Sequence, residues 1–132
     1  MTKKRYKKKK ARPHDGSTDS HHLCWPRRDW NKGAAKKLRA HHYCIVRIPK
    51  RSLHQRIHNE SPVVPVPKKL NVDSALFQLA LLEHFGGIRY DDPIEKRLRV
   101  LAAIFDCSEQ PTADAFRAQL EVVRKFNGKP SK

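Results

Sequence analysis

The chain has 132 residues and a formal net charge of +16 at pH 7, because 29 Lys and Arg outnumber 13 Asp and Glu. This length allows one modest domain or two very small ones, and no apolar stretch is long enough to span a membrane. Three cysteines without a C-x-x-C motif exclude a dense disulfide scaffold and lead us to expect a reducing, cytoplasmic compartment.

The positive charge is concentrated in the first half of the chain. Residues 1–12 carry eight basic and no acidic side chains, residues 21–69 carry twelve and two, and residues 70–127 carry seven and nine. Charge of this density repels itself, and a polyanion relieves that repulsion. We therefore expect nucleic acid as the partner rather than a membrane surface, because Pro13, Pro26 and Pro49 interrupt any long basic amphipathic helix.

The composition predicts three parts: a disordered basic tail over residues 1–20, a basic module over residues 21–69 and a small helical bundle over residues 70–132. In the basic module, β-branched and aromatic residues predict strands over residues 21–25 and 43–48. A short basic helix is expected over residues 30–42. A second helix over residues 53–60 has Ser52 as its predicted cap.

A connector with Pro62, Pro65 and Pro67 precedes the bundle, and no helix can run through it. Three helices are then predicted. The first covers residues 74–85, with Asp73 or Asn71 as its cap and Gly86-Gly87 as its stop. The second follows a cap at Asp92, with Pro93 in its first turn. The third covers residues 113–126 after a cap at Thr112. The resulting fold class is α+β and mostly helical.

Two pairs of histidines stand out among the eight in the chain. His54 and His58 are four residues apart on a predicted helix, so both imidazoles lie on one face and can hold one metal ion. His21 and His22 are adjacent on a predicted strand and point to opposite sides of it. One of them can therefore reach a metal ion while the other reaches a water molecule.

These motifs, H-H-L at 21–23, Y-C-I-V-R-I-P at 43–49 and L-H-Q-R-I-H at 53–58, resemble those of the HNH or His-Me finger nucleases with a ββα-metal core. The resemblance covers about residues 21–60. It implies a small ββα finger ahead of the three-helix bundle and an endonuclease activity on DNA or RNA. It also implies that His22 is the general base and that His21, His54 and His58 surround one divalent metal ion.

Phosphodiester cleavage gives a physical reason for such a set of residues. A divalent ion offsets the charge that develops on the phosphate oxygens, and a histidine with a near-neutral pKa can accept a proton from water. Nitrogen ligands favour zinc or nickel, whereas manganese or magnesium needs water and phosphate oxygens to complete its shell. Arg47, Arg51 or Arg56 can place a cation on the phosphate, with Arg56 on the helix of the two histidines.

The remaining basic residues are expected to contact the nucleic acid. The predicted contacts are Lys7, Lys8, Lys9, Lys10, Arg27, Arg28, Lys36, Lys37, Arg47 and Arg51. Two tryptophans, Trp25 and Trp30, flank the pair of arginines at 27–28. They can stack on exposed bases or seal a small core.

Two alternatives remain open at this point. In the first, Cys24 and Cys44 join His54 and His58 around a structural zinc ion, although small buried apolar residues are the favoured interpretation of both cysteines. In the second, the chain is a non-catalytic nucleic-acid-binding or inhibitor protein of the phage or mobile-element type. Such a protein would act on nucleic acid or on another nucleic-acid-handling protein. The preference for DNA or RNA and the oligomeric state stay open.

Overall fold

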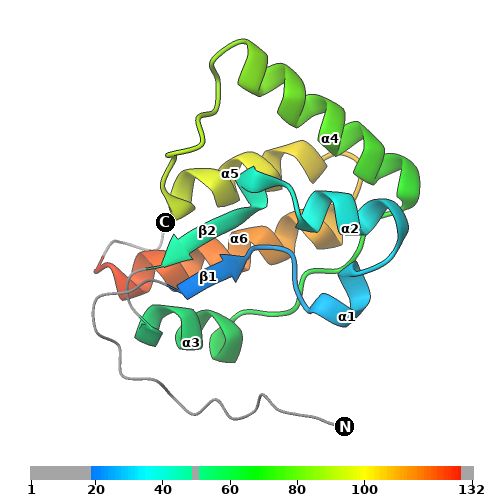
Figure 1. Cartoon of the computed structure of the whole chain (residues 1–132). Coiled ribbons are helices and arrows are strands. Elements are labelled where there is room, and N and C mark those ends of the chain that lie inside the picture. The colour runs from blue at the N-terminus through cyan, green and yellow to red at the C-terminus, as the bar shows by residue number, and fades with distance from the viewer. Residues whose placement is uncertain (1–18, 49–50, 129–132) are drawn as a thin grey trace, which may run out of the picture.

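A computed structural model describes residues 19–48 and 51–128 of the chain. Helices account for 64% of the described residues, and a two-stranded sheet accompanies six α-helices (Figure 1). The elements in chain order are β1 (Asp19–His22), α1 (Arg27–Trp30), α2 (Gly33–Arg39), the 3-10 turn η2 (His42–Cys44), β2 (Ile45–Ile48), α3 (Arg51–Glu60), α4 (Lys69–His84), α5 (Ile94–Phe105) and α6 (Gln110–Phe126). This composition agrees with the expected α+β, mostly helical class.

The sheet and α3 form a β-β-α arrangement. β1 pairs antiparallel with β2, so that His21 lies opposite Val46 and His22 opposite Ile45. Helices α1 and α2 lie in the connection between the two strands, and α3 follows β2 and packs on both strands. The two predicted strands are confirmed with shifted ends: the first begins two residues earlier, and residues 43–44 belong to η2.

The helical C-terminal part packs closely on this arrangement. α5 packs along α6, α6 also contacts α3, and α4 lies against α2 and α5 (Figure 1). One buried cluster draws on both parts of the chain. Its largest members are Leu23, Trp30, Leu38, Tyr43, Ile48, Ile57, Leu79, Leu98, Leu101, Phe105 and Phe116. The elements that carry the predicted site are therefore anchored on α6.

The proline-rich connector is extended, as predicted, and it covers Trp30. Val64 is buried; its amide donates to the Trp25 carbonyl at 2.9 Å, and its carbonyl accepts from Trp30 Nε1 at 2.8 Å. Trp30 is itself fully buried. Of the two roles expected for this tryptophan, the structure shows the one in the core.

The predicted helix caps are wrong, because three of the helices begin before the residue expected to cap them and the fourth has no side-chain cap. α3 includes Ser52, α4 starts at Lys69 and therefore includes Asn71 and Asp73, and α6 includes Thr112. α5 begins after Pro93, with no side-chain cap from Asp92.

Tertiary hydrogen bonds occupy three of these polar side chains instead. Thr112 Oγ1 donates to the Pro65 carbonyl at 2.8 Å, and Asp92 Oδ2 accepts from Tyr43 Oη at 2.7 Å. Asn71 Nδ2 donates to Glu109 Oε1 at 2.9 Å. These long-range contacts outweigh the local capping preference on which the prediction relied.

No helix in the described part of the chain combines the length and the apolarity that a membrane crossing requires.

The packing of α5 and α6 leads to a stability prediction. Leu98 is fully buried, whereas Leu120 is only partly buried although the same apolar periodicity predicts both as core. We expect Leu98→Ala to lower the free energy of unfolding by roughly 2–5 kcal/mol and Leu120→Ala by clearly less, because truncation costs most where a cavity is left. Chemical denaturation of the two variants measures the difference. Equal losses would contradict this assignment of the core.

Candidate metal centre

Three histidines from two elements meet in one cluster. β1 contributes His21, and α3 contributes His54 and His58 one helical turn apart. One nitrogen from each ring lies within 4.8 Å of the others. The ring centroid of His21 is 4.9 Å from that of His54 and 5.3 Å from that of His58. Three imidazole nitrogens at this separation form a group that can hold a metal ion after small side-chain adjustments.

Gln119 on α6 determines which ring nitrogen of the buried His21 carries the proton. His21 Nε2 lies 2.8 Å from Gln119 Oε1, while the amide nitrogen of Gln119 donates to the Leu23 carbonyl at 3.3 Å. The second contact orients the amide so that its oxygen faces His21. His21 Nε2 must then carry the proton.

The other ring nitrogen of His21 is therefore the one with a lone pair. His21 Nδ1 is buried and has no hydrogen-bond partner among the described residues. Metal-binding histidines commonly donate one N–H to an acceptor and ligate through the other nitrogen. The contact with Gln119 thus prepares His21 Nδ1 as a ligand atom.

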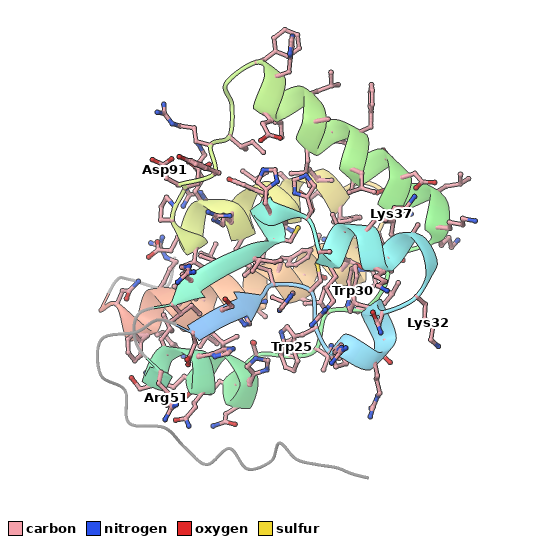
Figure 2. All side chains as sticks on the ribbon, viewed as in Figure 1. Trp25, Trp30, Lys32, Lys37, Arg51 and Asp91 are labelled. Carbon is pink, nitrogen blue, oxygen red and sulfur yellow. The ribbon has the colours of Figure 1, made fainter. Side chains whose placement is uncertain are left out.

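The two helical histidines have different surroundings. His54 Nδ1 lies 3.4 Å from Asp19 Oδ2, two residues before His21 on the same face of β1. His58 packs edge-on against Trp25, with ring centroids 4.5 Å apart, and it is the exposed member of the cluster. Figure 2 shows Trp25 between the sheet and α3. Asp19 can thus orient His54 or join the ligand set, and Trp25 covers one side of His58.

Two members of the cluster, His21 and His58, have lowered pKa values. Burial lowers the pKa of His21 to about 3, against the opposing effect of its contact with Gln119. Burial and the neighbouring His54 also lower the pKa of His58. Metal binding requires neutral imidazole, so the lowered pKa values of His21 and His58 favour the form that binds an ion.

His22 follows His21 on β1 and is partly exposed. Burial lowers its pKa, with further contributions from the positive charges of Arg39 and Arg27. A neutral imidazole at pH 7 has a lone pair that can accept a proton. The Nε atom of Arg39 is buried and has no hydrogen-bond partner within the described ranges. His22 is therefore a neutral acceptor beside two cations.

Arg56 does not point at the histidines. Its guanidinium forms an ion pair with Glu60, with Nε and Oε2 at 2.9 Å, and lies 5.7 Å from the centroid of the Phe126 ring. Residue 56 is two positions from each of His54 and His58, which places it on the opposite face of α3. Among the described residues, Arg27 and Arg39 are cations near His22. Only Arg27 was predicted from the sequence to contact nucleic acid.

The basic residues predicted to contact nucleic acid are mostly exposed where the structure describes them. Arg27, Arg28, Lys36, Lys37 and Arg47 are exposed, and Arg51 is partly exposed. Figure 2 places Lys37 on α2 and Arg51 on α3. Lys7, Lys8, Lys9 and Lys10, with the rest of the predicted basic tail before Asp19, lie outside the described residues.

The zinc-finger alternative is not supported by the geometry. Cys24 and Cys44 are fully buried free thiols. In the described part of the chain, His54 and His58 gather with His21 and not with either cysteine. Burial raises the pKa of Cys24 well above its ordinary value, which opposes the thiolate that zinc requires. Both cysteines thus behave as small apolar residues of the core, as the favoured interpretation had it.

A second group of ligand types lies on the surface between η2 and α4. It contains His41, His42 and Glu83. His42 Nε2 is 3.0 Å from Glu83 Oε2, and His41 Nδ1 accepts a hydrogen bond from the Tyr43 amide at 3.0 Å. Neutral His41 must then carry its proton on Nε2, so neither of its nitrogens offers a free lone pair. This group is less suited to a metal ion than the buried cluster.

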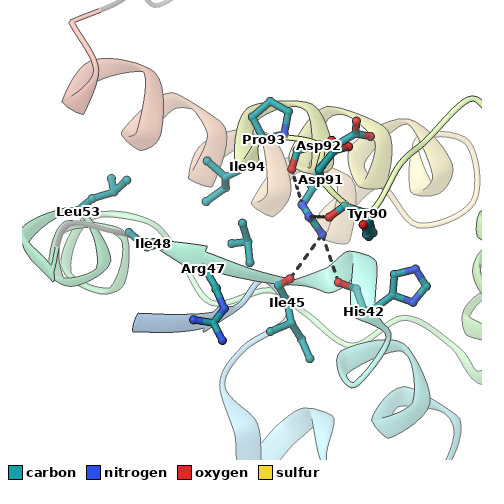
Figure 3. A pocket seen from close by; sticks show the side chains of 12 residues that line it. His42, Ile45, Arg47, Ile48, Leu53, Tyr90, Asp91, Asp92, Pro93 and Ile94 are labelled. Carbon is teal, nitrogen blue, oxygen red and sulfur yellow. Dashed lines mark hydrogen bonds between the residues drawn. The ribbon is translucent and has the colours of Figure 1, made fainter. Parts of the chain in front are cut away.

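A groove of about 580 Å³ lies beside β2, away from the cluster (Figure 3). Its walls come from β2, from the 90–93 loop and from the start of α5, with further contributions from His42 of η2 and Leu53 of α3, and none of the three clustered histidines lines it. Arg97 lies in this wall but donates to backbone carbonyls of Asp92 and Tyr90. The Arg97 guanidinium therefore holds backbone carbonyls in the groove wall and is not available to bind a ligand there.

Comparison of the chain with protein-family models, with curated proteins and with solved structures finds no match. The assignment of a function to the cluster therefore depends on its geometry and its chemistry.

Gln119 leads to a prediction that separates hydrogen bonding from packing. Gln119→Leu removes the acceptor for His21 Nε2, and we expect metal affinity to fall about 10–100-fold, the usual effect of losing such an outer contact. Gln119→Glu keeps an acceptor at the same place and should retain most of the affinity. Both variants lose the bond to the Leu23 carbonyl, so their difference isolates the contact with His21. Competition with a chromophoric chelator measures both affinities, and equal losses would contradict the proposed role.

Proposed function

We propose that this protein is a metal-dependent nuclease of the HNH type, acting on DNA or RNA. The observation that carries the proposal is the meeting of His21, His54 and His58 within 4.8 Å on a strand and the helix that packs on it. The β-β-α arrangement and the adjacent His22 also fit the family that the motifs resemble. The net charge of +16 suits a polyanionic substrate.

The residues present fit one divalent ion. Three imidazoles and a nearby carboxylate, Asp19, favour zinc or nickel, whereas manganese or magnesium would take most of its ligands from water and phosphate. When bound, such an ion supplies positive charge to the phosphate oxygens that become more negative during cleavage. The chain's own contribution is to hold the three nitrogens in place and to favour the neutral forms of His21 and His58.

His22 is the proposed base. Its lowered pKa leaves the ring neutral at pH 7, so it can take a proton from a water molecule that attacks the phosphorus. Arg27 and Arg39, the cations beside His22, replace Arg56 as the proposed contacts to the phosphate, because Arg56 is paired with Glu60. A guanidinium suits this role through its two parallel N–H groups.

The decisive test measures metal content and cleavage in the same preparation. The full-length chain is freed of metal with a chelator and then loaded with zinc, nickel, manganese or magnesium. Each form is incubated with supercoiled plasmid, linear duplex, single-stranded DNA and RNA. We expect one ion per chain and cleavage that the chelator abolishes. Tight binding of nucleic acid without cleavage under any of these ions would replace the nuclease with the non-catalytic binding protein.

A further inference from the structure

Helix α4 has apolar side chains on two opposite faces. Val72, Ala75 and Leu79 are buried against the rest of the molecule. On the outer side, four large apolar side chains are exposed, and we call them the outer stripe. They are Leu70 at 80% exposure, Phe77 at 65%, Leu81 at 41% and Phe85, which directly follows the helix, at 78%.

The outer stripe is a continuous line and not a scatter of single residues. Its members are separated by seven, four and four positions, which places them on one side of a helix with 3.6 residues per turn. At 1.5 Å per residue the line is roughly 22 Å long. α4 lies at the edge of the molecule, on the far side from α3 (Figure 1). An exposed apolar line of this length is typical of a protein–protein contact.

We propose that the outer stripe is the surface through which two copies of this chain associate, with the two α4 helices antiparallel about a two-fold axis beside Phe77. The residue numbers of the stripe are nearly symmetric about this position. In such a pair, Leu70 of one copy lies opposite Phe85 of the second, and Ser74 lies opposite Leu81. The two Phe77 rings meet at the axis, as an isologous contact requires.

Complementary polar side chains support this arrangement, because a carboxylate can accept a hydrogen bond from an imidazole N–H. Asp73 and His84 are both exposed, and helical geometry places them on the same flank of the outer stripe. The two-fold rotation leaves this flank on the same side of the helix pair in both copies. Asp73 of one copy therefore comes within about two residues of His84 of the second copy. The pairing occurs twice in each dimer. A parallel arrangement would instead place like residues side by side along the whole helix.

Other occupants fit the stripe less well. The segments outside the described residues contain only Met1 and Tyr6 as large apolar or aromatic residues, too few to cover a line of four. An anionic membrane surface is disfavoured by Asp73, whose carboxylate lies on the flank of the outer stripe. The proposed dimer leaves α3 and its histidines on the outer side of each copy, and it does not depend on the nuclease proposal.

The first test is the mass of the full-length chain in solution. Analytical ultracentrifugation from about 1 µM to 1 mM covers the usual range of weak and moderate dimers. We expect a monomer–dimer equilibrium that shifts toward the dimer as salt rises, because screening reduces the repulsion between two strongly basic chains. Phe77→Glu should lose the dimer, since it places two carboxylates at the axis. Tyr90→Glu is the matched control: Tyr90 is 73% exposed but lies outside α4, so this variant should still dimerise.

Cross-linking tests the proposed register. In a Cys107→Ser background, Phe77→Cys should form a disulfide between two copies, because the axis brings the two positions together. Leu81→Cys alone should not, since its two copies are about 10 Å apart along the helices. A mixture of Ser74→Cys and Leu81→Cys chains should cross-link to each other. Circular dichroism shows whether each variant keeps its helices.

Three outcomes would overturn the proposal. The first is a monomer at every concentration and salt. The second is a dimer that survives both Phe77→Glu and Leu81→Glu, which would place the contact elsewhere. The third is a monomer that binds vesicles of anionic lipid and loses this binding on Phe77→Glu, which would make the outer stripe a membrane contact.

Discussion

Replacing His58 by alanine is expected to remove both the bound metal ion and any cleavage of nucleic acid, whereas replacing His22 should remove cleavage alone. His58 supplies one of the three clustered imidazole nitrogens, and two imidazoles bind an ion more weakly than three do. His22 lies beside the cluster and is proposed to touch only the attacking water. His22→Ala should therefore keep the metal and the affinity for nucleic acid, while cleavage slows by about 10²–10⁴-fold, the usual contribution of a positioned base.

The matched control for these two variants is His42→Ala. His42 belongs to the second surface group, pairs with Glu83 and is not part of the buried cluster. This variant should keep both metal and cleavage. Metal content by mass spectrometry and initial rates on one substrate distinguish the three proteins. If His42→Ala loses the ion while His58→Ala retains it, the metal lies at the surface group. If His22→Ala cleaves at the normal rate, another group is the base.

Local sequence patterns predicted much of the geometry around the cluster. Two histidines four apart on a helix must share a face, and neighbouring residues on a strand must point to opposite sides. The same reasoning predicted the strands and the helices α5 and α6, whose apolar residues repeat along one face. α4 has apolar residues on two faces, and its end was predicted instead from Gly86-Gly87. It also left a signal unused: Asp19 is two residues before His21 on the strand, so the same alternation places both on one face.

The contacts that cross the whole chain had no such signal. Gln119 is 98 positions from His21, and nothing in its helical surroundings marks it as the acceptor for a strand histidine. Thr112 and Asp92 were predicted as caps because their local context favours that role, yet they bond to Pro65 and Tyr43. Local sequence correctly indicates that such polar residues lie close to the start of a helix. It does not include the tertiary partner that decides where their hydrogen bonds go.

Arg97 is the clearest example, and we expect its loss to destabilise the fold strongly. Its side chain is 5% exposed and lies over the Tyr43 ring at 4.9 Å. The guanidinium donates to the carbonyls of His42, Tyr43, Ile45, Tyr90 and Asp92, most of which Figure 3 shows as dashed lines. These contacts connect the start of β2 to the 90–92 loop and to α5. One side chain thereby joins the sheet of the candidate site to the helical part.

Arg97→Met keeps much of the length and the apolar stem of the side chain but leaves several carbonyls without their donor. Each buried polar group left unsatisfied costs about 1–3 kcal/mol, so we expect the free energy of unfolding to fall by about 3–4 kcal/mol. Arg99→Met is the matched control, because Arg99 lies on the same helix and is exposed. Its effect should stay within about 0.5 kcal/mol, the usual range for a surface substitution. Urea denaturation of both variants measures the difference. Similar losses for the two would mean that the carbonyls around Arg97 find water when the guanidinium is removed, and that the connection between β2 and α5 rests on apolar packing alone.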